Sequence, residues 1–527
     1  MKRTAFLLLL LVAWLAIGVW GIAGLLLSLG IPAVRRGLAP SWRFAGGVLA
    51  VLLVATAVVV VLPDGRLPIP PGPGLLVTPS YIGGRATPHP LTMPVPQHPF
   101  LAPDGRSSMH DDAWATDTYT WAGPLGRSPE VDTSWFGIEE CATLAFTSAG
   151  DLVAMCGDVH GPTLHLIDPD SMEKLATFDL PDRPGGRDKA PWEDLCAGAY
   201  FYLDNNDRAV VATTDRRILV VATSDAAGHP GLSQVASYDV SGAVPQGDCL
   251  VALMPDWDGR IWFGTEQGRV GLLDPADGAT TGLELGGAIA NSLAVDERGA
   301  YVVTDHAMYL LVASRSGRVS IAWRTAYDRG SEQKPGQLSQ GSGTTPTVLP
   351  GGLVAITDNA EPRMDVVVLR TSDGSEVCTV PAFEAGASDT ENSLVSVGDG
   401  VVVENNYGYS SPLSATLGRS TTPGIARVDV SVAGCSVAWT SDEVAPSSVP
   451  KVSLRNGLLY VYTTRASRWL VNAWYLTAID VRNGRTVFSV RTGTGVLSNN
   501  HYAAVTLGPS GAAYIATLGG LVRVRDG

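Results

Sequence analysis

Two long apolar runs open the chain, and short segments of β-branched residues fill most of the rest. Residues 5–29 carry no charged side chain, and residues 44–62 form a second run interrupted only by Thr56. Each run is as long as the roughly 20 apolar residues that cross a bilayer as a helix. The pattern therefore predicts a membrane segment over residues 1–63 that contains two transmembrane helices, 5–29 and 44–62.

The orientation of this hairpin follows from its basic residues. The loop between the runs carries Arg35, Arg36 and Arg43, against Lys2 and Arg3 in the N-terminal tail. Because basic loops tend to stay in the cytoplasm, the loop is expected inside and the large C-terminal part outside, in the extracytoplasmic space. A cleaved signal peptide is the competing interpretation of the first run, but its apolar stretch is usually only about 7–15 residues long.

A proline-rich spacer and an aromatic arm are predicted over residues 64–118. Twelve prolines lie between residues 63 and 103, which is typical of an extended, semi-rigid segment. The stretch from Met109 to Trp121 is rich in Trp, Tyr and Asp, so we expect it to dock on the domain that follows. Within it, His110 beside Asp112 is a candidate acid–base pair, although a contact that closes the domain is the structural alternative.

Beyond Glu139 the chain repeats a unit of about 51 residues, in which an apolar triplet ends in Thr before an acid. The marked positions are Gly157-Asp158, Thr214-Asp215, Thr265-Glu266, Thr304-Asp305, Thr357-Asp358, Glu404-Asn405, Thr463-Thr464 and Thr517-Leu518. Each unit reads as four short strands, and no long amphipathic helix interrupts them.

Four-stranded units at this spacing predict an all-β fold, a β-propeller over residues 119–527. We expect eight blades, with seven as the alternative. The last unit has only three strands, and we expect the arm near residues 119–121 to supply the fourth.

Charge and cysteine content narrow the function classes. The formal net charge is −14, and without residues 1–66 it becomes 31 − 50 = −19, which argues against nucleic acid as a partner. The six cysteines are an even number, as expected for disulfides outside the cytosol. Cys141 and Cys156 flank one turn and are predicted to pair, whereas the connectivity of the other four stays open.

The repeat places many polar residues around one mouth of the channel. Carboxylate and amide oxygens suit a hard cation such as Ca²⁺. The predicted metal ligands are Asp358, Asn359, Glu391, Asn392 and Glu404. Hydrogen bonds within the strand turns are the structural alternative for the acids that recur in nearly every blade.

The same mouth offers candidates for chemistry and for ligand binding. His306 beside Asp305 is the predicted catalytic base, with a hydrogen-bonded rim residue as the alternative. The insert from Tyr327 to Thr345 reads as a lid or binding loop. The predicted ligand-binding residues are Arg329, Lys334, Thr344, Asn406 and Tyr407.

The turn at residues 478–485, followed by Phe488, resembles the tryptophan-docking repeat of quinoprotein (PQQ-type) propellers. The strand ends at Trp323 and Trp439 echo the same repeat. The resemblance implies the propeller architecture. The complete docking motif recurs nowhere, so a PQQ cofactor is not expected.

Residues 291–305 resemble one blade of gluconolactonase and strictosidine-synthase-like propellers. In that group Glu, Asn and Asp hold a calcium ion in the channel, so this resemblance implies Ca²⁺. The stretch from Tyr327 to Thr347, with residues 391–393 and 404–409, looks like a group of uncharacterised propellers and implies no activity.

The leading interpretation is a membrane-tethered, extracytoplasmic propeller whose polar mouth binds a divalent cation and a small polar ligand. As an enzyme it would be a metal-dependent lactonase or esterase, in which the metal polarises the carbonyl and His306 relays a proton. The alternatives are a non-catalytic envelope scaffold that binds protein or glycan and, third, a quinone-dependent dehydrogenase.

Overall fold

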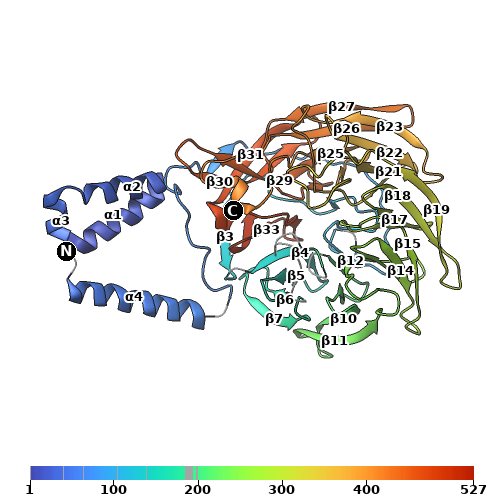
Figure 1. Ribbon diagram of the computed structural model, residues 1–527, viewed down its shortest axis with the longest axis horizontal. Coiled ribbons are helices and arrows are strands. Elements are labelled where there is room, and N and C mark those ends of the chain that lie inside the picture. Colours follow the sequence, from blue (N-terminus) through green and yellow to red (C-terminus); the bar gives the residue numbers. More distant parts are fainter. Residues whose placement is uncertain are drawn as a thin grey trace.

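The computed structural model describes residues 2–38, 41–62, 64–103, 105–137, 139–183, 194–196 and 200–527, without the side chains of 59–61. Eight sheets stand in a ring around a central channel, and the helices lie to one side of this ring (Figure 1). The predicted all-β, eight-bladed propeller is thereby confirmed, and the alternative of seven blades is wrong.

Blades one to four are consecutive antiparallel sheets of four strands each. Their strands are β4 (Glu140–Phe146), β5 (Leu152–Gly157), β6 (Pro162–Ile167) and β7 (Lys174–Asp179); β8 (Phe201–Leu203), β9 (Ala209–Ala212), β10 (Arg217–Ser224) and β11 (Pro230–Asp239); β12 (Leu250–Pro255), β13 (Ile261–Thr265), β14 (Arg269–Leu273) and β15 (Thr280–Glu284); and β16 (Ala294–Asp296), β17 (Gly299–Val303), β18 (Ala307–Ala313) and β19 (Val319–Ala326).

Blades five and six follow the same plan, whereas blades seven and eight recruit strands from the N-terminal region. Their strands are β20 (Thr347–Leu349), β21 (Leu353–Thr357), β22 (Asp365–Arg370) and β23 (Glu376–Pro381); β24 (Val395–Ser396), β25 (Gly400–Glu404), β26 (Ile425–Ser431) and β27 (Gly434–Ser441); β28 (Lys451–Ser453), β29 (Leu458–Ala466), β30 (Asn472–Asp480) and β31 (Arg485–Thr494), flanked by β1 (Tyr81–Gly83) and β2 (Thr118–Tyr119); and β32 (Val505–Leu507), β33 (Ala513–Thr517), β34 (Gly520–Arg525) and β3 (Glu130–Trp135). Two 3₁₀ turns, η2 (Pro412–Ala415) and η3 (Val496–Ser498), lie in loops.

The strand that closes the ring differs from the one predicted. The fourth strand of blade eight is β3, which pairs antiparallel with β34 from Glu130↔Arg525 to Trp135↔Gly520. Residues 118–119 instead form β2, which pairs parallel with β28 at the inner edge of blade seven. The ring is therefore closed by β3, which lies further along the chain than predicted, because residues 118–119 are already paired with β28.

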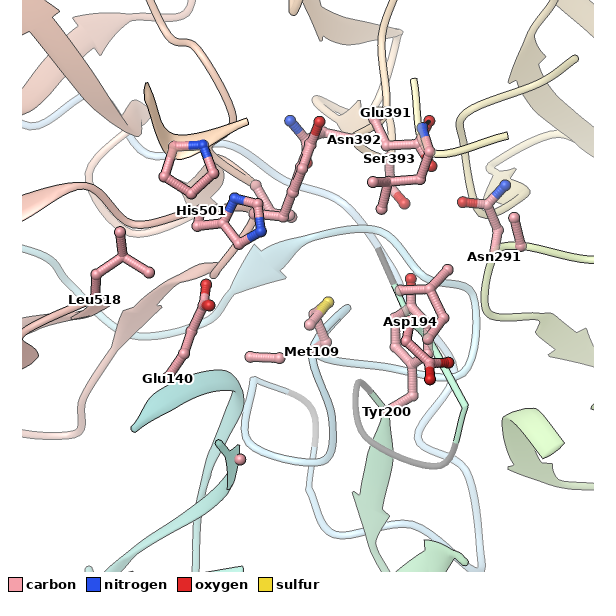
Figure 2. A pocket seen from close by; sticks show the side chains of 18 of the residues that line it. Met109, Glu140, Asp194, Tyr200, Asn291, Glu391, Asn392, Ser393, His501 and Leu518 are labelled. Atoms are coloured by element: carbon pink, nitrogen blue, oxygen red, sulfur yellow. Dashed lines mark hydrogen bonds between the residues drawn. The ribbon is translucent and has the colours of Figure 1, made fainter. Parts of the chain in front are cut away.

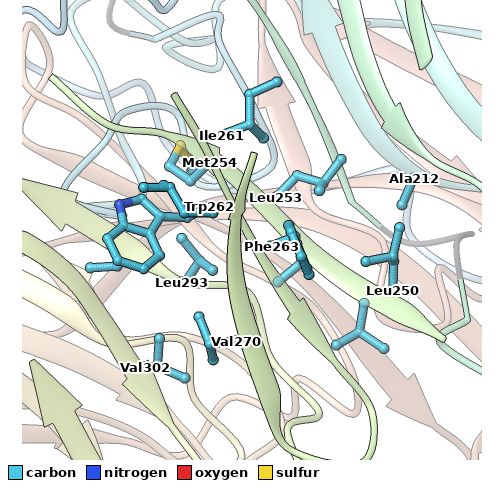
Figure 3. Packing of buried hydrophobic residues seen from close by; sticks show 14 of the residues in the cluster. Ala212, Leu250, Leu253, Met254, Ile261, Trp262, Phe263, Val270, Leu293 and Val302 are labelled. Atoms are coloured by element: carbon cyan, nitrogen blue, oxygen red, sulfur yellow. The ribbon is translucent and has the colours of Figure 1, made fainter. Parts of the chain in front are cut away.

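The core lies between neighbouring blades. Inner strands such as β12 and β13 are buried on both faces, whereas the outer strand β7 alternates between half-buried and exposed positions. Trp262 and Phe263 project from opposite faces of β13 into packing with the blades on either side (Figure 3). Continuous apolar inner strands and alternating outer strands are what radial packing of sheets requires.

Tryptophan docking joins two pairs of blades. The indole nitrogen of Trp323 donates to Thr371 O at 3.0 Å, and its ring lies over Gly374 of blade five. Trp439 donates to Val481 O at 2.8 Å and lies over Gly484 of blade seven. Both glycines have positive φ, and an added Cβ would meet the indole at 2.5–2.6 Å, so only glycine fits.

The arm is threaded along the inner strands at one end of the channel. Backbone N–H groups of five blades donate to its carbonyl groups at 2.6–3.0 Å: Leu203 to Ser107, Val295 to Ala113, Val348 to Trp114, Ser396 to Thr116, and Val452 to Asp117. The predicted docking is thus an extensive set of backbone hydrogen bonds. Because Met109 and His110 also line the central cavity, the arm forms its floor.

The remainder of the predicted spacer also lies against the propeller. Strand β1 adds to the outer edge of blade seven, and Gly65 and Leu67 exchange backbone hydrogen bonds with Trp135. Prolines that limit conformational freedom suit a segment that lies extended along a surface.

The N-terminal region contains four helices: α1 (Lys2–Ile17), α2 (Val19–Ser28), α3 (Pro32–Leu38) and α4 (Trp42–Val61). The first predicted helix, 5–29, is broken at Gly18, whose φ of 60° lies outside the right-handed helical region. Over the described side chains no single helix has the length and hydropathy of a membrane span. Helices α2 and α3 have that length and hydropathy when they are taken together, and the chain bends by 96° between them.

All six cysteines are paired, as Cys141–Cys156, Cys196–Cys249 and Cys378–Cys435. The first pair, which the sequence predicted, joins β4 to β5. The third pair joins β23 to β27 and therefore links blades five and six.

We expect the double variant Cys378→Ser/Cys435→Ser to lose about 3–4 kcal/mol of unfolding free energy, because this bridge closes a loop with a sequence separation of 57. Urea unfolding of the full chain measures the loss. Non-reducing peptide mapping of the wild type must recover the three bridges, and titratable thiols in the oxidised protein would contradict the pairing.

Candidate functional site

The ring encloses a central cavity of about 240 Å³ above the arm (Figure 2). Its lining comes from the arm, from the segments that lead into the inner strands, and from loops between second and third strands. These residues include Met109, His110, Glu140, Asp158, Arg183, Asp194, Leu195, Tyr200, Asn291, Leu338, Glu391, Asn392, Ser393, Val449, His501 and Tyr502. Glu391 and Asn392, which the sequence had placed at this mouth, both line the cavity.

Two half-buried carboxyl groups face the cavity from different blades. Glu140 begins β4 and accepts no hydrogen bond from the described residues; burial raises its pKa to about 8, although Arg183 opposes the shift. Glu391 accepts a hydrogen bond from the Leu338 N–H at 2.9 Å, and burial raises its pKa well above the usual value. Burial therefore favours the neutral form of both groups.

Behind Glu391 lies a buried network that unites three further predicted residues. Glu404 Oε1 accepts hydrogen bonds from the amides of Asn392 and Asn406. Asn406 Oδ1 in turn accepts from the Glu391 N–H at 2.8 Å. Burial raises the pKa of Glu404, and neither Glu404 Oε2 nor Asn392 Oδ1 has a hydrogen-bond partner among the described residues.

The other predicted metal ligands lie around a lysine of the insert. Lys334 Nζ donates to Ala360 O at 2.7 Å and to Ser388 O at 3.2 Å, between blades five and six. Burial lowers the pKa of Lys334, whereas nearby acids, among them Asp358, oppose that shift; burial raises the pKa of Asp358 to about 7. Asn359 donates to Arg329 O and Glu332 O.

The predicted metal ligands thus form two groups, and Asp358, Asn359 and Lys334 do not line the cavity. In the described part of the chain, one set of three His, Cys, Asp or Glu ligand atoms lies within 4.8 Å of one another. It consists of Cys196, Cys249 and Glu266, and its two cysteines form a disulfide.

The predicted catalytic pair is part of a hydrogen-bonded rim. His306 Nδ1 lies 2.7 Å from Asp305, which also accepts from the Ala288 N–H at 2.8 Å and from Arg329 at 2.9 Å. The His306 side chain is 46% exposed and does not line the cavity. Its assignment as a base remains a prediction.

The last two predicted ligand-binding residues support loops. Thr344 Oγ1 accepts from the Thr357 N–H at 3.0 Å inside blade five, and the Tyr407 N–H donates to Asn405 Oδ1 at 3.1 Å. Neither side chain lines the cavity.

A buried ion cluster lies at the floor of the cavity. Lys451, at the start of β28, is fully buried and donates to Asp117 and to Met109 O. Nδ1 of His110 donates to Asp117 at 3.1 Å rather than to Asp112, and Lys451 Nζ lies 3.6 Å from Asp111. Although burial raises the pKa of Asp117, Lys451 and His110 together hold it below the usual value.

This cluster was missed by the sequence analysis. The available signal was the rarity of lysine: the chain has five, and among the described residues Lys451 is the one lysine that lies in an inner strand. Its partners Asp111 and Asp117 are more than 330 residues away along the chain, so proximity could not be read from spacing.

No family model matches the chain. An uncharacterized protein of Archaeoglobus fulgidus is 30% identical over 325 residues, which cover 53% of this chain and 62% of that relative. The match therefore spans less than two thirds of the relative's own length.

Among solved structures, quinohemoprotein alcohol dehydrogenase of Comamonas testosteroni is similar with a TM-score of 0.51 and 11% identity, over 81% of this chain and 80% of that one. BamB of Moraxella catarrhalis is similar with a TM-score of 0.43 and 13% identity, over 78% and 94% of the two chains. At such identities the likeness concerns the fold. It supports the resemblance to quinoprotein propellers at that level and implies no activity.

Lys451→Met is expected to destabilise the protein by about 3–5 kcal/mol, because it leaves Asp117 buried without its cation. The double variant Lys451→Met/Asp117→Asn should recover a large part of the loss. Denaturant unfolding measures both. Equal stability of Lys451→Met and the wild type would contradict the buried ion cluster.

Glu140→Gln is expected to stabilise the protein at alkaline pH. A carboxyl group whose pKa rises on folding contributes stability below its unfolded pKa of about 4.5, and this contribution is lost as pH rises toward 8. The amide avoids the loss, so unfolding at pH 8.5 should show a gain of about 2–4 kcal/mol that vanishes near pH 4. Glu130→Gln, at the exposed first position of β3, is the matched control, and a pH-independent gain would contradict the assignment.

Proposed function

We propose that this protein is a membrane-anchored, extracytoplasmic propeller that binds a small organic cation in its central cavity. The observation that carries the proposal is the pair of half-buried carboxyl groups, Glu140 and Glu391, which face one cavity with no hydrogen bond from a basic side chain among the described residues. A ligand ammonium group would supply the missing charge and draw both carboxyls into their ionised form.

The rest of the lining supports a cation rather than an anion. Four carboxyl groups, Glu140, Asp158, Asp194 and Glu391, line the cavity, against the single described guanidinium group of Arg183. Tyr, Met, Val and Leu side chains between them can cover an apolar ligand body. A tricarboxylate such as PQQ would meet like charges, which does not favour the quinone-dependent alternative.

The size of the cavity favours a small molecule over a protein or glycan chain. Its volume of about 240 Å³ is below the roughly 300–1,000 Å³ of sites for drug-sized ligands. The non-catalytic scaffold alternative would need an open surface instead. The hydrolase interpretation depends on His306, which lies outside the cavity, so we propose binding rather than hydrolysis.

Calcium is the second candidate ligand. Asn392 Oδ1 is a buried oxygen without a hydrogen-bond partner among the described residues, and Glu391 stands beside it in the chain. Amide and carboxylate oxygens are the donors that Ca²⁺ prefers. It ranks second because no three carboxylates of the described lining come within 4.8 Å of one another.

The proposed location rests on the N-terminal apolar runs and on the disulfides. Three bridges in one domain are typical of proteins that fold in oxidising surroundings. Together with the basic loop between the runs, they support an anchored domain on the outer side of the membrane.

Thermal unfolding of the full chain in detergent, with putrescine, Ca²⁺, glucose and PQQ as separate probes, tests the proposal. We expect putrescine to raise Tm in a concentration-dependent manner, with stabilisation of about 2.7 kcal/mol at 100 times Kd. The shift should weaken as pH falls below 8, because protonation of Glu140 competes with the cation.

The double variant Glu140→Gln/Glu391→Gln should abolish the putrescine shift, and His306→Ala, outside the cavity, should leave it unchanged. A shift with Ca²⁺ alone would favour the second candidate. A shift with PQQ, or a putrescine shift that survives the double variant, would contradict a cation site in this cavity.

A further inference from the structure

Large apolar side chains are exposed together at one edge of the propeller. Among the described residues beyond the helices, twelve such side chains are exposed, and six of them belong to four segments at this edge. These six, which we call the apolar rim, are Leu76, Val77, Leu413, Leu417, Trp469 and Val496. The other six are distributed over blades one, two, four and six, so the rim is a local concentration.

The segments of the rim are in direct contact. The Gly418 N–H donates to Asn472 Oδ1 at 2.8 Å, and the Asn472 amide donates back to Arg419 O, which ties the η2 loop to the β29–β30 turn. The Gly495 N–H donates to Asn472 O at 2.9 Å, which brings η3 to the same place. Three of the four rim segments therefore lie next to one another, and Gly74 of the fourth lies close to Val471.

The N-terminal helices meet the chain at this surface. The Gly74 N–H donates to Trp14 O at 3.0 Å, and the Leu76 N–H donates to Leu15 O at 2.9 Å. Gly18, at the break between α1 and α2, lies close to Val471 of the β29–β30 turn. The helices accordingly leave the ring on the side of β30 and β31 (Figure 1).

The charge of the rim differs from that of the whole chain. Residues 72–79, 411–421, 466–472 and 494–499 contain no Asp or Glu, although the net charge of the protein is −14. Their charged residues are Arg419 and Arg468, both exposed. Arg468 lies 5.5 Å from the centre of the Trp469 ring.

We propose that the apolar rim rests on the lipid bilayer, with Trp469 and the leucines at the level of the headgroups. Tryptophan and arginine beside exposed leucines are the composition of interfacial membrane contacts, and arginines without acids suit anionic headgroups. The proposal builds on the membrane anchoring stated above, since helices that enter the bilayer at this edge bring the rim to its surface.

The contact holds the propeller in a fixed orientation. A tether through the helices alone would leave the ring free to turn, whereas a second, interfacial contact beside the anchor fixes one edge against the membrane. Blade seven then faces the bilayer, and the opposite side of the ring, with β19, faces away from it (Figure 1).

Site-directed fluorescence on the full-length protein in vesicles of phosphatidylcholine and phosphatidylglycerol tests this orientation. Because no native cysteine is free, Trp469→Cys and Leu417→Cys each introduce a single reactive thiol for an environment-sensitive fluorophore. Ile321→Cys, on β19, is the matched control: Ile321 is 43% exposed, compared with 52% for Trp469. Nitroxide-labelled lipids then serve as the quencher.

We expect about threefold stronger lipid quenching at 469 and 417 than at 321, with blue-shifted emission. Flotation of the vesicles after alkaline extraction reports anchoring separately. Protein that floats but is quenched equally at all three positions would overturn the rim contact and leave the anchor in place. Protein that does not float would overturn both. Arg419→Glu/Arg468→Glu should weaken the quenching at Leu417→Cys without loss of flotation.

Discussion

The arm that crosses the channel is the constraint on which the rest of the molecule depends. Five blades donate backbone hydrogen bonds to it, and the buried ammonium of Lys451 binds its Asp117 and its Met109 carbonyl. Buried backbone groups and a buried charge are costly unless they are paired, so blades and arm each satisfy the other. The ring and its N-terminal segment therefore have to assemble together, and the channel becomes a cavity with a floor instead of a pore.

Lysine side chains lie beside acidic groups at the floor of the channel and in the insert, whereas the two carboxyl groups of the cavity have no such neighbour hydrogen-bonded to them. At the floor Lys451 neutralises Asp117, and between blades five and six Lys334 lies among the acids of the insert. In the cavity, Glu140 and Glu391 accept no hydrogen bond from a basic side chain among the described residues, and burial favours their neutral form. Their place on the cavity wall makes these two carboxyl groups the ones that a cationic ligand would meet.

One edge of the ring combines the helices, the apolar rim and blade seven, which is also the blade with two added strands. Strands β1 and β2 extend this sheet to six, and both come from the segment that joins the helices to the ring. The blade that lies next to the N-terminal helices is thus the one that takes two further strands from the segment that follows them. The chain that leaves the helices runs first along β3 of blade eight, at Gly65 and Leu67, and then adds β1 to blade seven.

The sequence by itself determined the fold class. The period of about 51 residues, the apolar inner strands and the tryptophan strand ends predicted eight blades, and the docking of Trp323 and Trp439 on glycines bears out the resemblance. These features are local, since each blade repeats its own pattern of residues. The same locality explains why Glu391, Asn392 and Glu404, three of the five predicted metal ligands, lie in one network, because they belong to one blade.

Only the tertiary structure decided which residues of different blades share the cavity. Closure of the ring brings Glu140 of blade one to the same space as Glu391 of blade six, and it buries Lys451 against an arm more than 330 residues earlier. Ring closure also leaves the His306 side chain partly exposed, outside the cavity. Residues 130–135 form the closing strand, because the segment before them already lies in the channel. The spacing of residues along the chain cannot predict such contacts, because these side chains become buried and paired only once the ring has closed.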